Sequence, residues 1–273
     1  EEVAALLKKG GCRALTHLDL SRNGLGDVGL RALAEALVAN TRNDQRLSCL
    51  KLKRNVIHSG VTALFRQLAH GNLRYLSTLD LSDNSIPGSA VARDLVKAVT
   101  HCSVADTWKS LDLSGNPIGD DALSTLFRTI SKRPKCNLNC LEDLRLTHVE
   151  MGDRAMEALS GLMVQGRLER MRCLDISFNR IRPEGIVIFA SALRDMIPPP
   201  QLESLSLAGN YVQDEGIRSL CHALRGMTSL VRLDVSMNGL VERLTHLSFT
   251  DVEESCPNLR EIRVAADVGI LQY

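Results

Sequence analysis

Cysteines, histidines and repeated Asp-x-Ser triplets are the residues of this sequence that could carry out chemistry. Cys136 and Cys140 have a spacing that suits two zinc ligands, but no second pair completes a four-ligand site. The 7 histidines are scattered and include no metal-binding pair. Triplets such as Asp80-Leu81-Ser82 belong to a strand pattern and do not form a nucleophile arrangement. The sequence therefore predicts no catalytic residue, no metal site and no cofactor.

One recurring nine-residue frame, L-x-x-L-x-L-x-x-N, organises the chain, and Leu202 to Asn210 is a full copy of it. Asn closes seven of the copies, whereas Val149 and Asp267 stand there in the fifth and ninth. Self-similarity at a period of this length is typical of repeat proteins, and each unit has room for a helix. The nine copies begin at Leu15, Leu47, Leu76, Trp108, Leu141, Met171, Leu202, Leu230 and Leu259.

Each unit is predicted to hold a short strand, a turn and a helix. Alternate strand residues face one side, so Leu18 and Leu20 point inward and Asp19 points outward. The side-chain amide of Asn23 is expected to bind backbone groups of the turn and of the next unit. Apolar residues at helical spacing then follow, and small residues such as Gly60 and Gly185 are expected to let helices begin close to their neighbours. The helical set of the first unit is Leu30, Leu33, Ala34 and Leu37.

Alternation of strands and helices predicts an α/β fold with one parallel sheet. Helices are about 10 Å wide and strands about 5 Å apart, so the stack must curve with its strands inside. We expect a single domain over residues 1–273, with a partial repeat or cap at 1–14 and a degenerate cap at 239–273. Trp108 takes a leucine position of the frame and is assigned to packing in the core.

Composition narrows the function classes. The net charge of +1 gives no general attraction to nucleic acid or to anionic lipid. No run of 18 apolar residues predicts a membrane span. The 8 cysteines in 273 residues are too sparse for a disulfide scaffold, which favours reduced thiols in a cytosolic or nuclear protein, and we expect a cytoplasmic one. We expect a protein or peptide partner and no nucleic acid, membrane or small-molecule substrate.

The run from Asn23 to Leu37, and the similar run from Asn210 to Leu224, resemble the ribonuclease-inhibitor type of leucine-rich repeat. The resemblance covers about residues 15–235. It implies a leucine-rich repeat solenoid, or horseshoe, with the parallel sheet on the concave face and helices on the convex face. That subfamily includes inhibitors, innate-immune sensor domains, an actin-capping domain and the GTPase-activating protein of Ran, so the resemblance implies a binding surface.

The outward strand positions and the turns beside them are the candidate binding residues. Side chains at the middle strand position should form one column, because neighbouring strands lie about 5 Å apart. This column either neutralises itself through salt bridges or presents a charge pattern to a partner, with Asp80 and Asp112 able to accept a basic group. The candidate residues are Asp19, Lys51, Lys53, Arg54, Asp80, Asp112, Arg145, His148, Asp175, Phe178, Asp234 and Met237.

Three functions fit these features. The leading hypothesis is a non-enzymatic scaffold that binds a protein or peptide on its concave face. The first alternative is a GTPase-activating protein resembling the Ran activator, although the acidic tail typical of that family is absent from this sequence. The second alternative is a ligand-sensing or autoinhibitory repeat domain of a larger receptor.

Overall fold

The computed structural model describes residues 2–9, 12, 14–41, 46–101, 107–133, 138–197, 199–240, 252 and 254–264. Within these residues, nine three-residue strands form one parallel sheet in the order of the sequence. The strands are β1 (His17–Asp19), β2 (Cys49–Lys51), β3 (Thr78–Asp80), β4 (Ser110–Asp112), β5 (Asp143–Arg145), β6 (Cys173–Asp175), β7 (Ser204–Ser206), β8 (Arg232–Asp234) and β9 (Glu261–Arg263).

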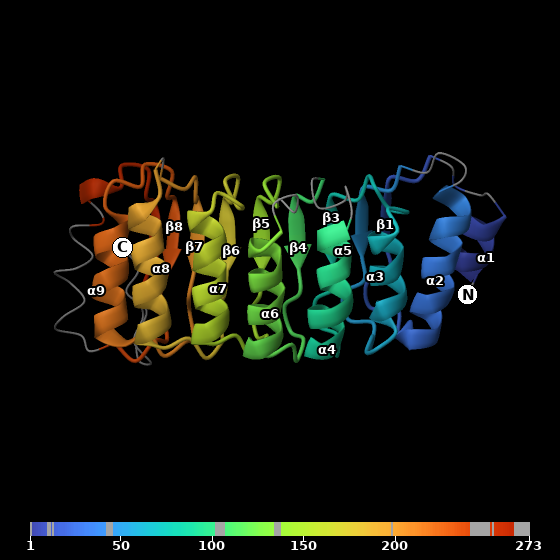
Figure 1. Cartoon of the computed structure of the whole chain (residues 1–273), viewed down its shortest axis with the longest axis horizontal. Helices are drawn as coiled ribbons and strands as arrows, with labels where there is room; N and C mark the ends of the chain where they lie inside the picture. The colour runs from blue at the N-terminus through green and yellow to red at the C-terminus, as the bar shows by residue number, and fades with distance from the viewer. Residues whose placement is uncertain are drawn as a thin grey trace.

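Helices connect the strands and lie in a row on one face of the sheet (Figure 1). The helices are α1 (Glu2–Lys8), α2 (Gly26–Thr41), α3 (Val61–Ala69), α4 (Gly88–Ala90), α5 (Val96–His101), α6 (Asp120–Ser131), α7 (Asp153–Val164), α8 (Pro183–Asp195) and α9 (Gln213–Leu224). A π-helical turn, η1 (Val91–Leu95), joins α4 to α5.

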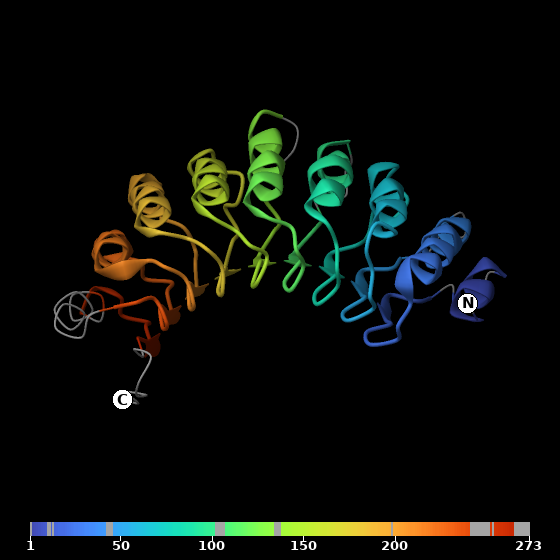
Figure 2. The ribbon, with the colours of Figure 1, turned by 90° about the horizontal axis from the view of Figure 1, so that it is seen from below.

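The sheet and the helices form two nested arcs, with the strands on the inside of the curve (Figure 2). The predicted α/β horseshoe is therefore confirmed. The C-terminal cap expected over 239–273 stays a prediction, because residues 241–251, 253 and 265–273, among them Asp267, lie outside the described part. Cys136 also lies outside it.

Leucines fill the space between the two arcs. Leu50, Leu79 and Leu111 are aligned across three neighbouring strands, and each is buried. The helical set predicted for the first unit, from Leu30 to Leu37, is buried as well. Trp108 is buried in the same core, as its place in the frame predicted. Apolar burial at about 25 cal/mol per Å² is the main force that holds the stacked units together.

Side chains of Asn tie each unit to the unit before it. Oδ1 of Asn84 accepts hydrogen bonds from the N–H groups of Asn55 and Ile57, while its Nδ2 donates to the carbonyls of Leu52 and Leu81. The amide thus serves its own turn and the preceding unit, and not the next unit as expected from the sequence. The same role is taken by Asn55, Asn116, Asn179, Asn210 and Asn238.

Val149 has no side-chain amide, and the turn of the preceding unit is hydrogen-bonded differently. The N–H of Ile118 bonds to the carbonyl of Asn116, whereas the matching N–H groups of Leu25 and Ile57 donate to an Asn side-chain oxygen of the following unit. A backbone carbonyl of the same turn here replaces the side-chain oxygen that would otherwise accept this N–H.

Carboxylates at helix starts form a second set of links between units. Oδ1 of Asp27 accepts a hydrogen bond from the N–H of His58 (2.8 Å), and Oδ1 of Asp120 accepts two from Gly152 and Ala155. A Cβ at Gly60 would lie 2.6 Å from the Cα of Asp27, so the close approach of neighbouring units requires glycine. This bears out the role expected for the small residue there.

Candidate functional site

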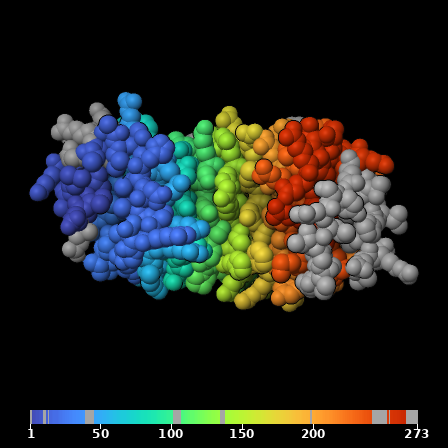
Figure 3. Space-filling view, turned by 180° about the vertical axis from the view of Figure 1, so that it is seen from behind, coloured from blue at the N-terminus to red at the C-terminus, as the bar shows by residue number. Residues whose placement is uncertain are grey.

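The middle residues of the strands form the column that the frame predicted. Asp80 pairs in register with Lys51 on one side and with Asp112 on the other, and Arg145 lies between Asp112 and Asp175. Figure 3 looks onto the strand side of the molecule, where these units follow one another along the arc. The structure therefore brings together seven of the twelve candidate residues in one row, namely Asp19, Lys51, Asp80, Asp112, Arg145, Asp175 and Asp234.

Each acid of this column binds the backbone of its own strand end. Oδ1 of Asp80 accepts hydrogen bonds from the N–H and the hydroxyl of Ser82. Oδ1 of Asp112 accepts from the N–H of Ser114 in the same way. This explains the Asp-x-Ser triplet, because the carboxylate satisfies the amide two residues on, where the chain leaves the sheet. Asp19, Asp175 and Asp234 make the equivalent bond.

Cations of the column pair mainly along their own strands. Arg145 binds Asp143 on the same strand (3.1 Å), and not Asp112 or Asp175 across the sheet. Arg263 likewise binds Glu261, with a longer contact of 3.9 Å to Asp234. Among the residues that the structure describes, no carboxylate lies within 4.0 Å of Lys51 Nζ. The charged side chains of neighbouring strands in the column therefore pair little with one another and can interact with charges of a partner.

Asp112 is an acid of the column whose pKa is raised. Burial raises its pKa, and the neighbouring Asp80 adds to the rise, while the N–H of Ser114 and the charge of Arg145 oppose it. A half-buried carboxylate next to a second one gains most when a cation arrives, because both the burial and the repulsion disfavour its ionised form. The pair is therefore chemically suited to a basic group.

Lys53 and Arg54 lie at the end of β2, beside the column. Nζ of Lys53 and Nε of Arg54 both contact Oδ2 of Asp83, at 3.2 and 3.1 Å. Burial works against ionisation of Asp83, but these two cations outweigh it and lower its pKa. One carboxylate therefore holds two cations, which leaves a net positive charge at this corner.

An aromatic and apolar strip occupies the corresponding corner of the later units. The rings of His148 and Phe178 are stacked, with centroids 4.6 Å apart and planes 10° from parallel. The Phe178 ring lies against Gly209, where a Cβ would approach it to 2.5 Å. Phe178 and Met237 are 39% and 50% exposed, so the ring packs on its neighbours while one face stays open.

The eighth residue of the frame places this strip. It adopts a left-handed backbone, with φ between 53° and 67°, in every unit from Arg22 to Met237. Such a backbone turns the side chain out at the edge of the sheet, and non-glycine residues rarely adopt it. Sequence reasoning missed this requirement, because glycine fills the position in two units only. The eight residues are Arg22, Arg54, Asp83, Gly115, His148, Phe178, Gly209 and Met237.

Tyr211 is a candidate that the sequence reading missed. It is 59% exposed and follows Gly209 by two residues, directly after the Asn of its frame. Its place outside the frame concealed it. Tyr211 is therefore a further exposed aromatic residue, in the turn that follows the seventh strand.

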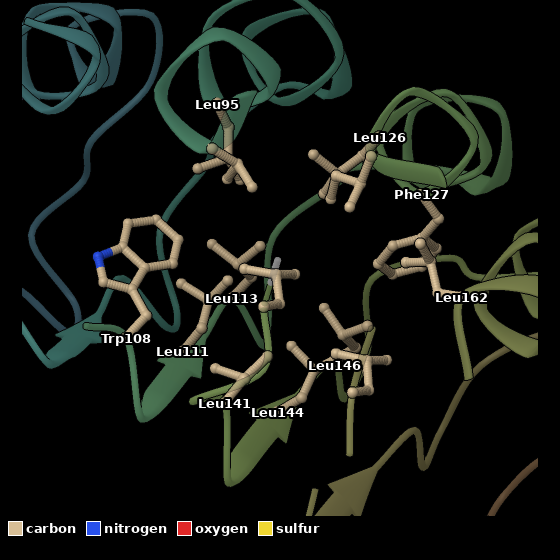
Figure 4. A pocket seen from close by; sticks show the side chains of 14 residues that line it. Leu95, Trp108, Leu111, Leu113, Leu126, Phe127, Leu141, Leu144, Leu146 and Leu162 are labelled. Atoms are coloured by element: carbon tan, nitrogen blue, oxygen red, sulfur yellow. The ribbon is translucent and has the colours of Figure 1, made fainter. Parts of the chain in front are cut away.

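The small cavity in the described leucine core is too small for a ligand of ordinary size. A cavity of about 20 Å³ lies between Trp108, Phe127 and the surrounding leucines, and apolar atoms line it (Figure 4). Ligand sites are typically about 300–1,000 Å³. The indole Nε1 of Trp108 points away from this cavity and has no hydrogen-bond partner among the residues that the structure describes. Within the described residues, no cluster of three or more possible metal ligands is found.

No helix in the described part is long and apolar enough to cross a membrane.

Comparisons with known proteins find the same repeat. A family model described as "Leucine Rich repeat" matches residues 11–34, 109–127, 171–190 and 200–221. The chain is 29% identical to the NACHT, LRR and PYD domains-containing protein 12 of Mus musculus, over 84% of this chain and 23% of that protein. It is 28% identical to the ribonuclease inhibitor of Mus musculus, over 83% of this chain and 40% of that protein. The chain thus spans less than half the length of these relatives.

A solved structure titled "Leiomodin-1 Actin-Binding Site 2 (ABS2)" is similar with a TM-score of 0.46 and 16% identity. The likeness covers 62% of this chain and 87% of that one.

Proposed function

The chain is a leucine-rich repeat protein of the ribonuclease-inhibitor type, and we propose that it is a non-enzymatic scaffold that binds a protein or peptide on its concave face. The coarser property, a repeat domain of a kind used for protein binding, follows from its similarity to ribonuclease inhibitors and to NACHT, LRR and PYD domains-containing proteins. The concave location and the residues of contact are the proposal.

The carrying observation is the register of the column. Asp80, Asp112 and Arg145 stand on consecutive strands with their charged groups on the same face. Their hydrogen bonds run along their own strands, so they hold each side chain in place without covering it. Side chains that are fixed before binding lose little conformational entropy when a partner docks.

We propose two kinds of contact on this face. The acids Asp80 and Asp112 receive a basic group, which relieves the repulsion between them. Lys53 and Arg54 contribute positive charge beside β2, and Phe178 with Met237 contributes an apolar anchor at the same edge of the sheet in the later units. Exposed aromatic and apolar side chains that are surrounded by polar ones are the usual anchors of protein interfaces.

Charge reversal tests the proposal with a matched pair of variants. Asp112→Lys and Arg145→Glu reverse charges in the column, whereas Asp121→Lys and Arg154→Glu reverse exposed charges on helices α6 and α7. Each variant is compared with the parent chain in crosslinking and pull-down from cell extract, after Trp108 fluorescence has established that it is folded. Loss of the recovered partner with the column variants alone supports the concave face. Unchanged recovery with the column variants, or equal loss with the helix variants, contradicts it.

A second candidate is a ligand-sensing or autoinhibitory repeat domain of a larger receptor. The alignment with 23% of the mouse NACHT, LRR and PYD domains-containing protein 12 favours it, because that protein carries such repeats together with other domains. The full-length gene product decides between the two. Further domains in that product support the receptor, and a product made of the repeats alone contradicts it.

A further inference from the structure

The end of the solenoid at β1 has the same apolar and hydrogen-bonding groups that join two successive repeats elsewhere in the chain. β1 is the first strand of the sheet, and its open side faces no described strand. Leu18 and Leu20 are only half-buried there, whereas the matching Leu50 and Leu52 of the next unit are fully buried. In the later units, the preceding unit covers the inward leucines. In the first unit these leucines are left partly exposed.

Backbone groups at this end are prepared for a further strand. In each later unit, two consecutive amides at the start of the strand donate to one carbonyl of the unit before, as Ser48 and Cys49 do to Thr16. This pair of bonds repeats from β2 to β9. The matching amides of the first unit are those of Thr16 and His17, and no described strand stands before them. Two donors at a sheet edge are a template for one specific acceptor.

The side chain of Asn23 shows the same open boundary. In the later units the Asn oxygen accepts N–H groups from the preceding turn, and the nitrogen donates to a carbonyl of the preceding strand. The side-chain nitrogen of Asn23 donates to the carbonyl of Ser21 in its own turn. The side-chain oxygen of Asn23, which would accept N–H groups of a preceding turn, lies at the open end of the solenoid.

Helix α1 shows where the further strand would have to lie. α1 packs against α2 and continues the outer row of helices, whereas the inner row of strands ends at β1 (Figure 2). A cavity of about 500 Å³ separates the first turn of α1, at Glu2 and Val3, from Leu20, Asn23 and Leu25. In every later unit, a strand and its turn fill the place between one helix and the neighbouring unit.

We propose that this end is a docking surface for one more strand-and-turn segment of the frame L-x-x-L-x-L-x-x-N, lying parallel to β1 and continuous with the first turn of α1. Its inward leucines cover Leu18 and Leu20, its backbone receives the amides of Thr16 and His17, and its turn donates to Asn23. Continuity with α1 follows from the cavity, which opens at Glu2 and Val3. This proposal is independent of what the concave face binds.

The test supplies such a segment from the chain itself. A copy of residues 202–217 is fused directly in front of Glu2, so that it brings a strand, an Asn turn and the first helical turn. Ala4 and Leu7 then take the places that Leu220 and Ala223 hold in α9, and all four are buried residues. A control fusion has the same length, with the copied Leu205 and Leu207 changed to Ser and the copied Asn210 changed to Ala.

Amide hydrogen exchange is the direct readout. Exchange at Thr16 and His17 is expected to slow about tenfold or more in the fusion relative to the parent chain, because a hydrogen-bonded amide exchanges only when the structure opens. The Tm is expected to rise as well. Asn23→Ala is expected to lower the Tm of the fusion more than that of the parent chain. The control fusion should leave exchange at both amides unchanged.

Two further arms keep the result decisive if the first fusion does not fold. A second fusion carries residues 171–186, the same span of the sixth unit. Unchanged exchange at Thr16 and His17 in both fusions, or failure of both to fold while the control folds, overturns the proposal. The parent chain is also examined by light scattering over a range of concentrations. Self-association that slows exchange at the same two amides would assign this end to a second copy and would likewise overturn it.

Discussion

The side-chain oxygen of Asn84 lies 2.9 Å from the backbone nitrogen of Asn55, and this hydrogen bond joins the turns of two successive repeats. Five bonds converge on the side-chain amide of Asn84, so replacing Asn84 by Ala leaves several buried backbone groups without a partner. Asn84→Ala is expected to lower the free energy of unfolding by about 2–4 kcal/mol. Urea unfolding followed by the fluorescence of Trp108 measures the change.

Asn23→Ala is the matched control for this prediction. Its side chain donates one exposed bond within its own turn, so the expected loss is below about 1 kcal/mol. Equal losses for the two variants would mean that the links between units do not determine the stability.

Asp27 gives the contact between the first two units a dependence on pH. Burial opposes its ionisation, but the N–H groups of His58 and Gly60 and the hydroxyl of Ser59 outweigh burial and lower its pKa. A lowered carboxyl pKa stabilises the fold above the ordinary pKa, near 3.8, and this contribution is lost as the pH falls through the lowered value. Asp27→Ala is expected to cost about 1–2 kcal/mol at pH 7, in line with the loss of a helix cap.

The difference between the parent chain and Asp27→Ala should shrink as the pH is lowered below 4. Chemical unfolding at several pH values tests this, with Asp121→Ala, at an exposed position of α6, as the control. A difference that does not change with pH would contradict the assignment of the effect to the carboxylate charge.

Asp112 should behave in the opposite way. Its pKa is raised, chiefly by burial, so its ionisation destabilises the fold once the pH exceeds the ordinary value near 3.8. Asp112→Asn keeps an oxygen that can accept the N–H of Ser114 and removes the charge next to Asp80. We expect this variant to be at least as stable as the parent chain at pH 7, with no gain at pH 3.

The same variant separates stability from binding. Under the proposed function, Asp112→Asn weakens capture of a basic partner although the fold is intact. A less stable Asp112→Asn protein at pH 7 would show that the carboxylate has a structural role beyond its bond to Ser114.

Gly209→Ala tests the aromatic strip. Gly209 has φ +65°, and an added Cβ would lie 2.5 Å from the ring of Phe178. Both effects disfavour alanine, so a loss of about 1–2 kcal/mol is expected, together with displacement of Phe178 from its stack on His148. The chemical shifts of the His148 ring report the displacement. Gly226→Ala, with φ +80° and open space around the Cβ, isolates the cost of the backbone conformation.

Sequence periodicity predicted the horseshoe, the strand positions and the column, because each depends on spacing within the frame. Leu50 and Asp80 could be placed from position alone. The bond between Asp27 and His58 could not, because it joins residues 31 apart whose distance depends on how tightly two units stack. The direction of the Asn bonds was likewise misread, since a sequence shows that an amide recurs but not which neighbour it faces.

The candidate site was predicted less completely than the fold. The row from Asp19 to Asp234 followed from alternation along the strands. The stack of His148 on Phe178, and the pairing of Arg145 with Asp143, depend on side-chain rotamers and on a left-handed backbone that most units achieve without glycine. No pattern of residue types records such choices.

The even spacing of the strands limits the shapes that can follow the column from Asp19 to Arg263. Parallel strands recur about every 4.8 Å, whereas an α-helix advances about 5.4 Å per turn. A straight helix laid along the column therefore falls out of step by half a turn after about four strands. Such a ligand can match a few consecutive units but not the entire arc, so a partner that uses both corners must bend or must change its conformation part of the way along.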